Sequence, residues 1–378
     1  MTRNPDPIRQ LDDDHFFRIR TRLLAWYRSH RRDLPWRNTA DPYAIWLSEV
    51  MLQQTRVETV RPYFHRFMER FPTIRDLAAA DLETVLKMWE GLGYYARARN
   101  FHKAANQVVS ELGGRVPDTL EVFRSLPGVG EYIAAAVLSI AFGRPCAVVD
   151  GNVKRVLARL FRMEQPVNQS TAHPAFRELS QRILDPEAPA DANQALMELG
   201  AMACTPRNPD CPACPLAGDC RAFRDDVAAD YPRRAKKKAI PLRVQAAAVL
   251  ARHGRVLVVR RPVEGLLGGL WEFPTVSLAK GECPASVLTQ MLQDRFGLAG
   301  GVAAELLGTV HHVYTHFRLE KQVFRCVDMG NGPLPAEGET VRWIEPGAGG
   351  EPPFHGAALK VFALLANGGK ISIGKGTD

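Results

Sequence analysis

The sequence predicts a multidomain protein, with an all-α region first and an α+β domain after it. Up to about Phe223, apolar residues recur three or four positions apart between proline- and glycine-containing breaks, which is the periodicity of amphipathic helices. From Val244 onward, short segments rich in β-branched residues replace that pattern, as expected for strands. A chain of 378 residues is long enough for two or three domains with cores of their own.

The apolar spacing places individual elements on both sides of a basic segment. In the first part we expect helices over residues 44–60, 82–89, 96–112 and 132–142. In the second we expect strands over 244–250, 255–259 and parts of 310–326, with a helix over 285–296. Between them, residues 231–243 (YPRRAKKKAIPLR) hold six basic residues and two prolines, which predicts an exposed linker. This charge run is either simply solvated or also close to the phosphates of a nucleic acid.

Composition limits the class of protein. The net charge of +8 favours a polyanionic partner such as nucleic acid, although many basic proteins bind none. No apolar run approaches the roughly 18 residues of a membrane span, and the N-terminal MTRNPDPIRQ has no signal-peptide core. We therefore expect no membrane association and a cytoplasmic location. Cys146, Cys283 and Cys326 are scattered, so we expect them to be buried thiols and not a disulfide framework.

Four further cysteines form a compact cluster with the spacing C-x6-C-x2-C-x5-C, at Cys204, Cys211, Cys214 and Cys220. Prolines lie between them, so the segment is a bent loop that can wrap its thiolates around one metal centre. Tetrahedral zinc is one interpretation. A 4Fe–4S cluster also takes four cysteine ligands, and we favour it because zinc sites usually pair CxxC-like motifs from separate hairpins. A metal-free set of thiols is the third alternative.

Residues 126–130 (LPGVG) lie between two helical patterns and predict a helix-hairpin-helix. Gly128 and Gly130 would leave backbone N–H groups exposed where the next helix begins, which suits a phosphate group. Glycine is also common in such turns for steric reasons alone.

Two carboxylates have helical settings that differ in electrostatics. Glu49 shares a helix face with Ile45, Trp46 and Leu52. Burial there would raise its pKa and make it a candidate general acid, unless it edges the face and reaches water. Asp150 follows an apolar run and precedes a helix, so it is a candidate N-cap that the helix end would keep ionised. One neutral acid and one anion are what cleavage of a glycosidic bond requires.

Several segments together resemble the MutY-type adenine DNA glycosylases of the endonuclease III superfamily, most closely over residues 33–223. The matching segments, besides the four-cysteine loop, are Pro35–Arg37, Trp46–Val60, Trp89–Asn100, Leu126–Val137, Val149–Leu160 and Asn193–Thr205. The resemblance implies a catalytic region over residues 1–230, a linker over 231–243 and a Nudix-like recognition domain over 244–378. Within the catalytic region it implies a helix-hairpin-helix subdomain over about 30–145 and an iron–sulfur subdomain over about 1–29 and 146–230.

The resemblance also implies roles for individual residues. Glu49 would protonate the adenine ring, Asp150 would stabilise or capture the sugar cation, and Tyr132 and Asn152 would support them. Gln54 and Tyr94 would wedge into the base stack while adenine is extruded, although Tyr94 could also be a core aromatic. Arg37 resembles a contact of the base pocket.

Position 132 separates branches of this superfamily. Lyase-competent relatives carry a lysine there, which forms a Schiff base with the sugar, whereas this chain has Tyr132. We therefore expect base removal by water with weak or no strand cleavage. Lys154 is a nearby amine that could trap an abasic sugar incidentally.

In the second domain, the segment Gln290–Leu298 matches the position of the Nudix metal-binding helix but holds only one acid, Asp294. Met291 and Arg295 replace metal-binding glutamates, so pyrophosphate hydrolysis is not expected. Tyr314-Thr315-His316 resembles the family's Phe-Ser-His loop, which reads 8-oxoguanine. Its alternative is a strand edge without a ligand. His311 and His312 are possible metal ligands, but no partner spacing supports them.

The expected function is adenine removal opposite 8-oxoguanine or guanine in base excision repair, by a monomer bound to double-stranded DNA, with further repair proteins able to dock on the linker. A pyrimidine-specific endonuclease III-type lyase and a non-catalytic iron–sulfur DNA-binding module are the alternatives. Tyr132 and the second domain argue against the lyase, and the module would not need Glu49 and Asp150.

Overall fold

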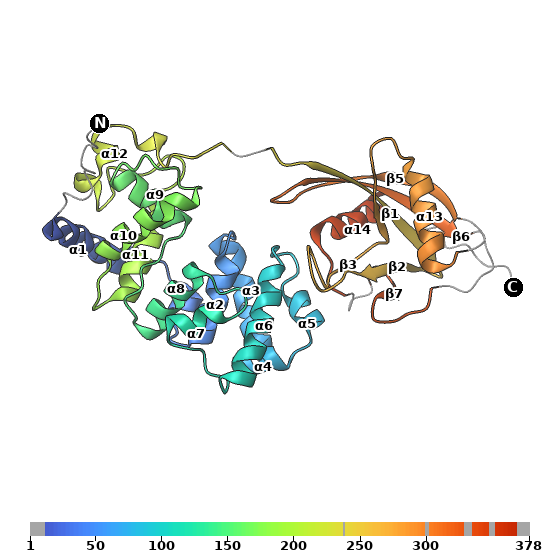
Figure 1. The fold of residues 1–378 in the computed structure, drawn as a ribbon, viewed down its shortest axis with the longest axis horizontal. Helices are drawn as coiled ribbons and strands as arrows, with labels where there is room; N and C mark the ends of the chain where they lie inside the picture. Colours follow the sequence, from blue (N-terminus) through green and yellow to red (C-terminus); the bar gives the residue numbers. More distant parts are fainter. Residues whose placement is uncertain (1–11, 237–238, 299–301, 329–334, 348–351, 369–378) are drawn as a thin grey trace. The chain divides into compact units, whose positions relative to one another are not determined.

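The computed structural model describes residues 12–236, 239–298, 302–328, 335–347 and 352–368 (Figure 1). The chain divides into two compact units, of which the first contains residues 1–78 and 103–237 and the second contains residues 79–102 and 238–378. Residues 79–102 are thus grouped with the C-terminal part of the chain, which nothing in the sequence indicated. The domain boundaries inferred from the sequence stay a prediction, and at the two termini they extend over residues outside the described part.

The first unit is helical. Its elements are α1 (Asp13–His30), α2 (Pro42–Leu52), α3 (Val57–Arg70), α4 (Ile74–Ala79), α7 (Leu120–Ser125), α8 (Glu131–Phe142), α9 (Gly151–Leu160), α10 (His173–Ile183), α11 (Pro189–Met202) and α12 (Arg221–Arg224). A further helix, α6 (Ala96–Glu111), begins in the second unit and ends in the first. No helix of the described residues is long and apolar enough to cross a membrane.

The core of the first unit follows from the helical spacing of its apolar residues. In α1, Phe16, Ile19, Leu23 and Tyr27 repeat every three or four positions and are buried. They pack with residues of α9, α10 and α11 in one hydrophobic cluster. Helix α8 is apolar and rich in alanine, and it is buried around most of its circumference, so that α2 and α11 can pack closely against it.

The expectation of a single helix over residues 44–60 is wrong. Helix α2 ends at Leu52 and α3 begins at Val57. Between them, Gln54 has a φ of 58°, in the left-handed region through which a right-handed helix of L-residues does not continue. The apolar spacing concealed this break because Val60 of α3 is buried as well.

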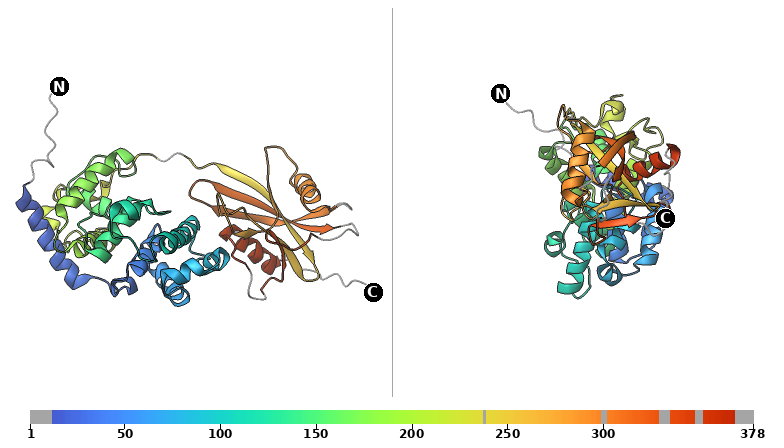
Figure 2. Two further views of the ribbon diagram at one scale, coloured as in Figure 1. Left: turned by 60° about the horizontal axis from the view of Figure 1, so that its bottom comes forward. Right: turned by 90° about the vertical axis from the view of Figure 1, so that its right-hand side faces the viewer.

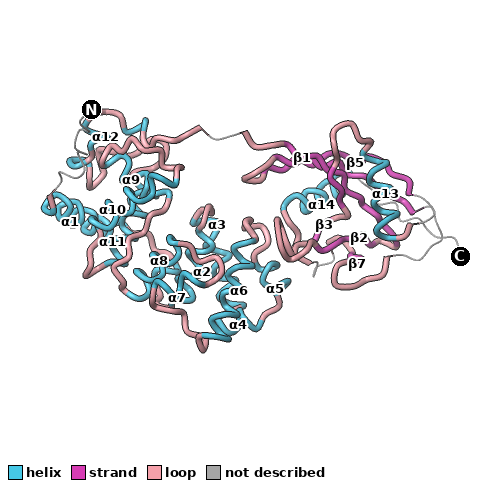
Figure 3. The backbone as a smooth tube through the Cα atoms, in the orientation of Figure 1, coloured by secondary structure: helices cyan, strands magenta, loops and turns pink. Residues whose placement is uncertain are grey.

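The second unit contains α5 (Leu82–Met88) and a seven-stranded sheet with two further helices. The strands are β1 (Leu242–Arg252), β2 (Arg255–Arg260), β3 (Trp271–Glu272), β4 (Thr275–Ser277), β5 (Val302–Val313), β6 (Arg318–Asp328) and β7 (Val341–Ile344). The main strand order is β3-β2-β1-β6-β5, with β4 on β1 and β7 on β2. Figure 3 shows that the strands follow the helical part of the chain, as predicted.

Two helices cover opposite faces of this sheet (Figure 2). Along β1, Ala246, Ala248 and Leu250 join the cluster that contains α13 (Pro284–Phe296). The alternate residues Ala247 and Val249 join the cluster that contains α14 (Gly356–Gly368). The two-residue alternation of a strand therefore builds a core on each side, and the α+β prediction is confirmed.

The basic segment after the first unit is less exposed at its start than predicted. Tyr231 is buried and donates a hydrogen bond to Glu164, so the expectation of an exposed linker is wrong at this residue. The side chain of Asn168 and the backbone of Ala235 hold each other by two hydrogen bonds, of 2.9 and 3.0 Å. Residues 237–238 of the predicted linker lie outside the described residues.

Candidate active site

Helices α2, α8, α9 and α11 of the first unit surround a cavity of about 370 Å³. Five of the predicted site residues line it together: Arg37, Glu49, Tyr132, Asp150 and Asn152. Its size suits a small organic ring system. The two candidate carboxylates therefore face one cavity, although they are far apart in the sequence.

Glu49 is the acid of this cavity whose pKa is raised to near neutrality. It is 5% exposed on α2, and its Oε2 accepts a hydrogen bond of 2.5 Å from the hydroxyl of Tyr132 on α8. Burial, together with the nearby negative charge of Asp150, raises the pKa of Glu49 to about 7, against the opposing hydrogen bond from Tyr132. A carboxyl group with such a pKa can hold a proton at neutral pH and give it to a bound molecule.

Asp150 caps helix α9, as predicted. Its Oδ1 accepts a hydrogen bond of 2.7 Å from the backbone N–H of Val153, and its Oδ2 accepts one of 3.1 Å from the side chain of Asn152. We expected the helix end to keep Asp150 ionised. Burial raises the pKa of Asp150, whereas the hydrogen bonds from Val153 and Asn152 act in the opposite direction. The donors still stabilise the anion, because each of them points at the charge.

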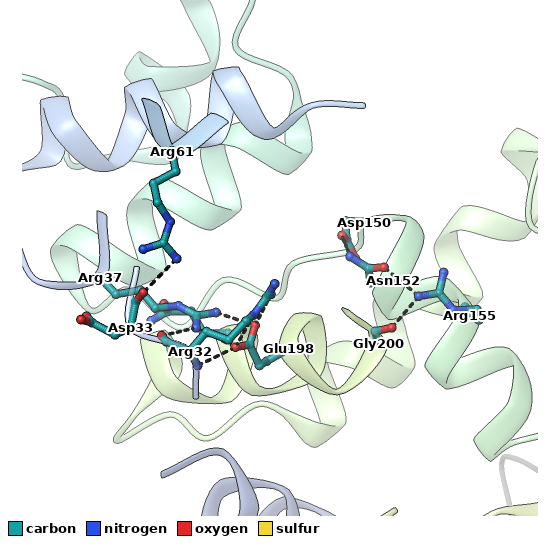
Figure 4. Close-up of polar contacts among 10 residues, drawn as sticks. Arg32, Asp33, Arg37, Arg61, Asp150, Asn152, Arg155, Glu198 and Gly200 are labelled. Atoms are coloured by element: carbon teal, nitrogen blue, oxygen red, sulfur yellow. Dashed lines mark hydrogen bonds and ion pairs between the residues drawn. The ribbon is translucent and has the colours of Figure 1, made fainter. Parts of the chain in front are cut away.

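A chain of hydrogen bonds leads from Asp150 toward the cysteine loop (Figure 4). Asn152 accepts a hydrogen bond of 2.8 Å from Arg155, which also donates to the carbonyl of Gly200 at 2.7 Å. The same guanidinium donates to the carbonyl of Cys204 at 2.7 Å. Arg155 therefore fixes the amide that orients Asp150 and also the start of the four-cysteine segment.

Glu198 was not among the predicted site residues. Its carboxylate accepts hydrogen bonds from two arginines (Figure 4). Glu198 is 1% exposed and binds the guanidinium groups of Arg32 and Arg37 through both oxygens. Burial alone would raise the pKa of Glu198, but the hydrogen bonds from both arginines lower it to about 2. Arg37 also donates to Gln194 at 3.1 Å, so its guanidinium is held rigidly at the cavity wall. The sequence does contain a signal for this residue, because Glu198 is an acid between the apolar residues Leu196 and Leu199 of α11.

The hairpin forms as predicted. Helix α7 ends at Ser125, Gly128 takes a φ of 78°, and Gly130 is the N-cap of α8. The side chain at the N-cap position does not cap α8, because Gly130 has none, and the first N–H groups of a helix have no partner within the helix. Glycine is required at position 128 because other residues rarely adopt a positive φ of this size.

The two predicted wedge residues share an unusual backbone conformation. Gln54 has a φ of 58° and Tyr94 has a φ of 49°, although neither is glycine, and such strain is concentrated at functional sites. Gln54 lies in the turn between α2 and α3, in the first unit. Tyr94 lies in the loop between α5 and α6 of the second unit, is 44% exposed, and shares a hydrogen bond of 3.0 Å with the hydroxyl of Thr315.

The four clustered cysteines line one pocket together with Arg159. Among the described residues, no three Cys, His, Asp or Glu side chains converge closely enough to hold a single metal ion. Four cysteine sulfurs around one pocket are the ligand set of a 4Fe–4S cluster, and tetrahedral zinc takes the same ligands. The buried Arg159 donates to Sγ of Cys204 at 3.3 Å and thus brings a positive charge to ligands that are anionic when they bind metal.

Arg159 also closes the cysteine segment on itself. It donates to the carbonyls of Thr205 and Pro206 at the start of the segment and to those of Ala228 and Tyr231 beyond its end. A bound cluster would cross-link the four cysteines of this loop, and Arg159 holds the two ends of the loop together.

In the second unit, Thr315 and His316 are exposed in the β5–β6 turn, whereas Tyr314 is half-buried. The ring of Tyr314 packs between His312 and Phe317, at centroid distances of 4.4 and 4.8 Å. On α13, Asp294 pairs with Gln290 at 2.8 Å. No acidic metal site forms there among the described residues.

Three known families match successive parts of the chain. Residues 47–183 match the HhH-GPD superfamily of base excision DNA repair proteins. Residues 204–220 match the iron–sulfur binding domain of endonuclease III, and residues 246–364 match the NUDIX domain. These matches confirm the predicted helix-hairpin-helix core, the iron–sulfur loop with its 4Fe–4S cofactor and the Nudix-like domain.

Solved structures and curated relatives agree with this division. The helical part resembles a thermostable thymine-DNA glycosylase (TM-score 0.52, 30% identity, 56% of this chain and 98% of the other). It also resembles endonuclease III in a non-covalent DNA complex (TM-score 0.50, 25% identity, 57% and 99%). The adenine DNA glycosylase of Mus musculus is 38% identical over 380 residues, covering 86% of this chain and 73% of the relative. That of Homo sapiens is 37% identical over 406 residues, covering 92% and 73%. The chain belongs to the adenine DNA glycosylases, the DNA-binding enzymes that remove adenine in base excision repair.

Proposed function

We propose that this glycosylase removes adenine paired with 8-oxoguanine or guanine, by hydrolysis of the N-glycosidic bond after the base has been flipped out of the duplex. The observation that carries the proposal is the cavity that Glu49 and Asp150 share, with Tyr132 donating to the acid and Val153 donating to the aspartate. One carboxyl group is poised to donate a proton, and the other is stabilised by donors as an anion. Glycosidic cleavage uses this division of labour.

Glu49 acts as the general acid. At its pKa of about 7, a substantial share of the enzyme carries the proton at neutral pH, and that proton passes to a ring nitrogen of adenine. The C–N bond then breaks with its electron pair on the base. Tyr132 holds the Glu49 carboxyl in place through the 2.5 Å hydrogen bond.

Asp150 faces the sugar cation that this step leaves. Its negative charge stabilises the cation, either as an ion pair or by capture, until a water molecule adds to the sugar carbon. Asn152 orients Asp150 through the 3.1 Å hydrogen bond, and Arg155 fixes Asn152 in turn.

Arg37 and Glu198 form the rigid polar wall of the base pocket. Both line the cavity, and their bidentate pairing with 2.9 Å hydrogen bonds presents fixed donors and acceptors to the edge of a planar base. Because Glu198 is already paired with Arg37 and Arg32, no unpaired carboxylate faces the base when adenine enters.

DNA is held outside the cavity by backbone and wedge contacts. The uncapped N–H groups after Gly128 and Gly130 suit a phosphate, and the net charge of +8 favours the duplex. Gln54 and Tyr94 enter the base stack, which offsets the few kcal/mol that unstacking costs.

The enzyme is essentially monofunctional. A tyrosine, and not a lysine, faces Glu49 at position 132, so no amine is placed there to form a Schiff base with the sugar. Lys154 is partly buried, and its Nζ donates to the carbonyl of Val167 at 3.4 Å. It is available only for incidental trapping of the product.

Partner-base reading belongs to the second unit. Thr315 and His316 are exposed at the tip of the β5–β6 turn, where a hydroxyl and an imidazole can bond a base edge. Tyr314 instead packs inward between His312 and Phe317 and serves to shape the turn. We propose that this turn distinguishes 8-oxoguanine from guanine.

The test is a set of duplexes that hold adenine opposite 8-oxoguanine, guanine, thymine or cytosine. We expect abasic sites with 8-oxoguanine first and guanine second, and strand breaks only after alkali treatment. Equal rates with all four partners would contradict the specificity. Strand breaks before alkali treatment would contradict the monofunctional assignment and favour an endonuclease III-type lyase.

A further inference from the structure

The wedge loop around Tyr94 is built into the same compact unit as the Nudix-like domain. Residues 79–102 contain α5, the loop with Tyr94 and the first turns of α6. Their side chains make a series of direct contacts with residues 265–271, 342 and 353–354, here called the docking contacts. Neither the motifs nor the catalytic cavity gave these residues a role.

Arg99 is the central docking contact. It is 9% exposed, and its two terminal nitrogens donate to the carbonyls of Gly268 and Gly265 at 3.0 and 2.9 Å. A buried guanidinium that bonds two carbonyls of one loop fixes both its distance and its orientation. A single hydrogen bond would leave the loop free to rotate about that bond relative to α6.

Three further residues of this segment make docking contacts, through four hydrogen bonds. Glu83 accepts hydrogen bonds from the indole of Trp271 at 3.2 Å and from Arg342 at 2.5 Å. Glu90 accepts from the backbone N–H of Phe354 at 2.7 Å, and Tyr95 donates to the carbonyl of the same residue at 3.2 Å.

The backbone of Gly269 also lies close to a side chain of α5. A Cβ placed on Gly269, whose φ is 74°, would lie 3.1 Å from a methyl carbon of Leu86 on α5. That distance is tight for a carbon–carbon contact, so glycine at this position lets the loop approach α5. The hydrogen bonds and the close packing at Gly269 thus join the same two segments, residues 79–102 and the loop that contains Gly269.

At the edge of this surface, the hydroxyl groups of Tyr94 and Thr315 share a hydrogen bond of 3.0 Å. Both belong to exposed turns, so the bond alone cannot hold them in register. The docking contacts can hold Tyr94 and Thr315 in register, because the residues that make them are buried or half-buried and lie on both sides of Tyr94 in the sequence.

From this arrangement we infer that Arg99, with Glu83 beside it, is a specificity-determining positioning residue. The docking contacts hold the wedge residue Tyr94 in register with the reading turn at Thr315, so that extrusion of adenine responds to the base opposite. This inference rests on the proposed function of the turn. It assigns no contact with DNA to Arg99 itself.

The experiment compares full-length variants by single-turnover excision of adenine opposite 8-oxoguanine and opposite guanine. Arg99→Met keeps the bulk and removes every donor. We expect it to lower the ratio of the two rates by roughly tenfold, equivalent to about 1.4 kcal/mol, with Arg99→Lys intermediate. General damage to the fold would lower both rates together and leave their ratio unchanged.

Lys103→Met is the matched control, since it removes one positive charge from the exposed side of the same helix. It should retain the full ratio. If Arg99→Met does not fold, as judged by loss of its melting transition, Glu83→Gln replaces it and should lower the ratio in the same direction. An unchanged ratio in the folded variant would overturn the inference. Absence of any 8-oxoguanine preference in the parent enzyme would instead contradict the proposed function.

Discussion

The hydroxyl of Tyr132 on α8 donates a hydrogen bond of 2.5 Å to Glu49 on α2, in a cavity that both share with Asp150. Tyrosine at this position does two things. It provides a donor that favours the ionised form of Glu49 and so limits the rise in pKa that burial causes. In the proposed function, it also stands at the position where a lyase would need an amine.

The rate of adenine release should depend on pH with an alkaline limb near pH 7. Glu49 must be protonated to act as an acid, and its pKa is about 7, so the single-turnover rate should fall as pH rises through that value. Above it, the slope should approach tenfold per pH unit, about the limit for one proton. A rate that stays constant between about pH 6 and pH 9 would contradict the role of Glu49.

The same buried acid should cost stability at alkaline pH. The pKa of Glu49 is raised in the folded state from its ordinary 4.5 to about 7. The stabilisation that protonated Glu49 gives to the folded state is therefore fully present below pH 4.5 and is lost as pH rises through about 7. Glu49→Gln should therefore raise the urea midpoint of unfolding at pH 8 and change it less at pH 5. Tyr132→Phe, which removes the donor to the anion, should lower the midpoint at pH 8. A midpoint that Glu49→Gln lowers equally at both pH values would contradict the assignment.

Tyr314 carries a hydroxyl that the fold does not use. Within the described part of the chain, this buried oxygen has no hydrogen-bond partner, and an unsatisfied buried hydroxyl costs about 1–3 kcal/mol. Tyr314→Phe should therefore stabilise the protein by about 1 kcal/mol, measured by urea unfolding. Thr315→Val, a change at an exposed position, is the comparison and should have little effect. Destabilisation by Tyr314→Phe would show that the hydroxyl is bonded.

Arg159 should be needed for retention of the iron–sulfur cluster. Arg159→Gln removes the donor to Cys204 and leaves carbonyls at both ends of the cysteine segment without their donor. We expect loss of roughly 3 kcal/mol or more of stability, less bound iron per chain and faster bleaching of visible absorption by a chelator. Arg207→Gln, an exposed change in the same loop, is the control. Equal iron content in both variants would argue against this role.

Local pattern predicted much of the fold and of the site. Glu49 could be placed on a buried helix face and Asp150 at an N-cap because both follow from the spacing of neighbouring residues. The resemblance to a family then assigned them to one cavity. The cysteine spacing likewise contained enough information to favour an iron–sulfur loop.

Features that depend on distant parts of the chain could not be predicted in this way. The break at Gln54 contains no proline or glycine, and Gln54 nevertheless adopts a φ of 58°. Glu198 gains its meaning only from Arg32 and Arg37, which lie more than 150 positions away in the sequence. The grouping of residues 79–102 with the C-terminal unit likewise rests on contacts such as that between Arg99 and Gly268, which no local pattern records.

The most direct test of the account is the Asp150→Asn variant with a duplex that holds adenine opposite 8-oxoguanine. Asparagine keeps the size and can still accept the hydrogen bond from Val153, but it lacks the charge that stabilises the sugar cation. We predict that the variant binds the duplex with an affinity close to that of the parent enzyme, while the single-turnover release of free adenine falls by about 10³-fold or more. Release of adenine at a rate near that of the parent enzyme would contradict the account.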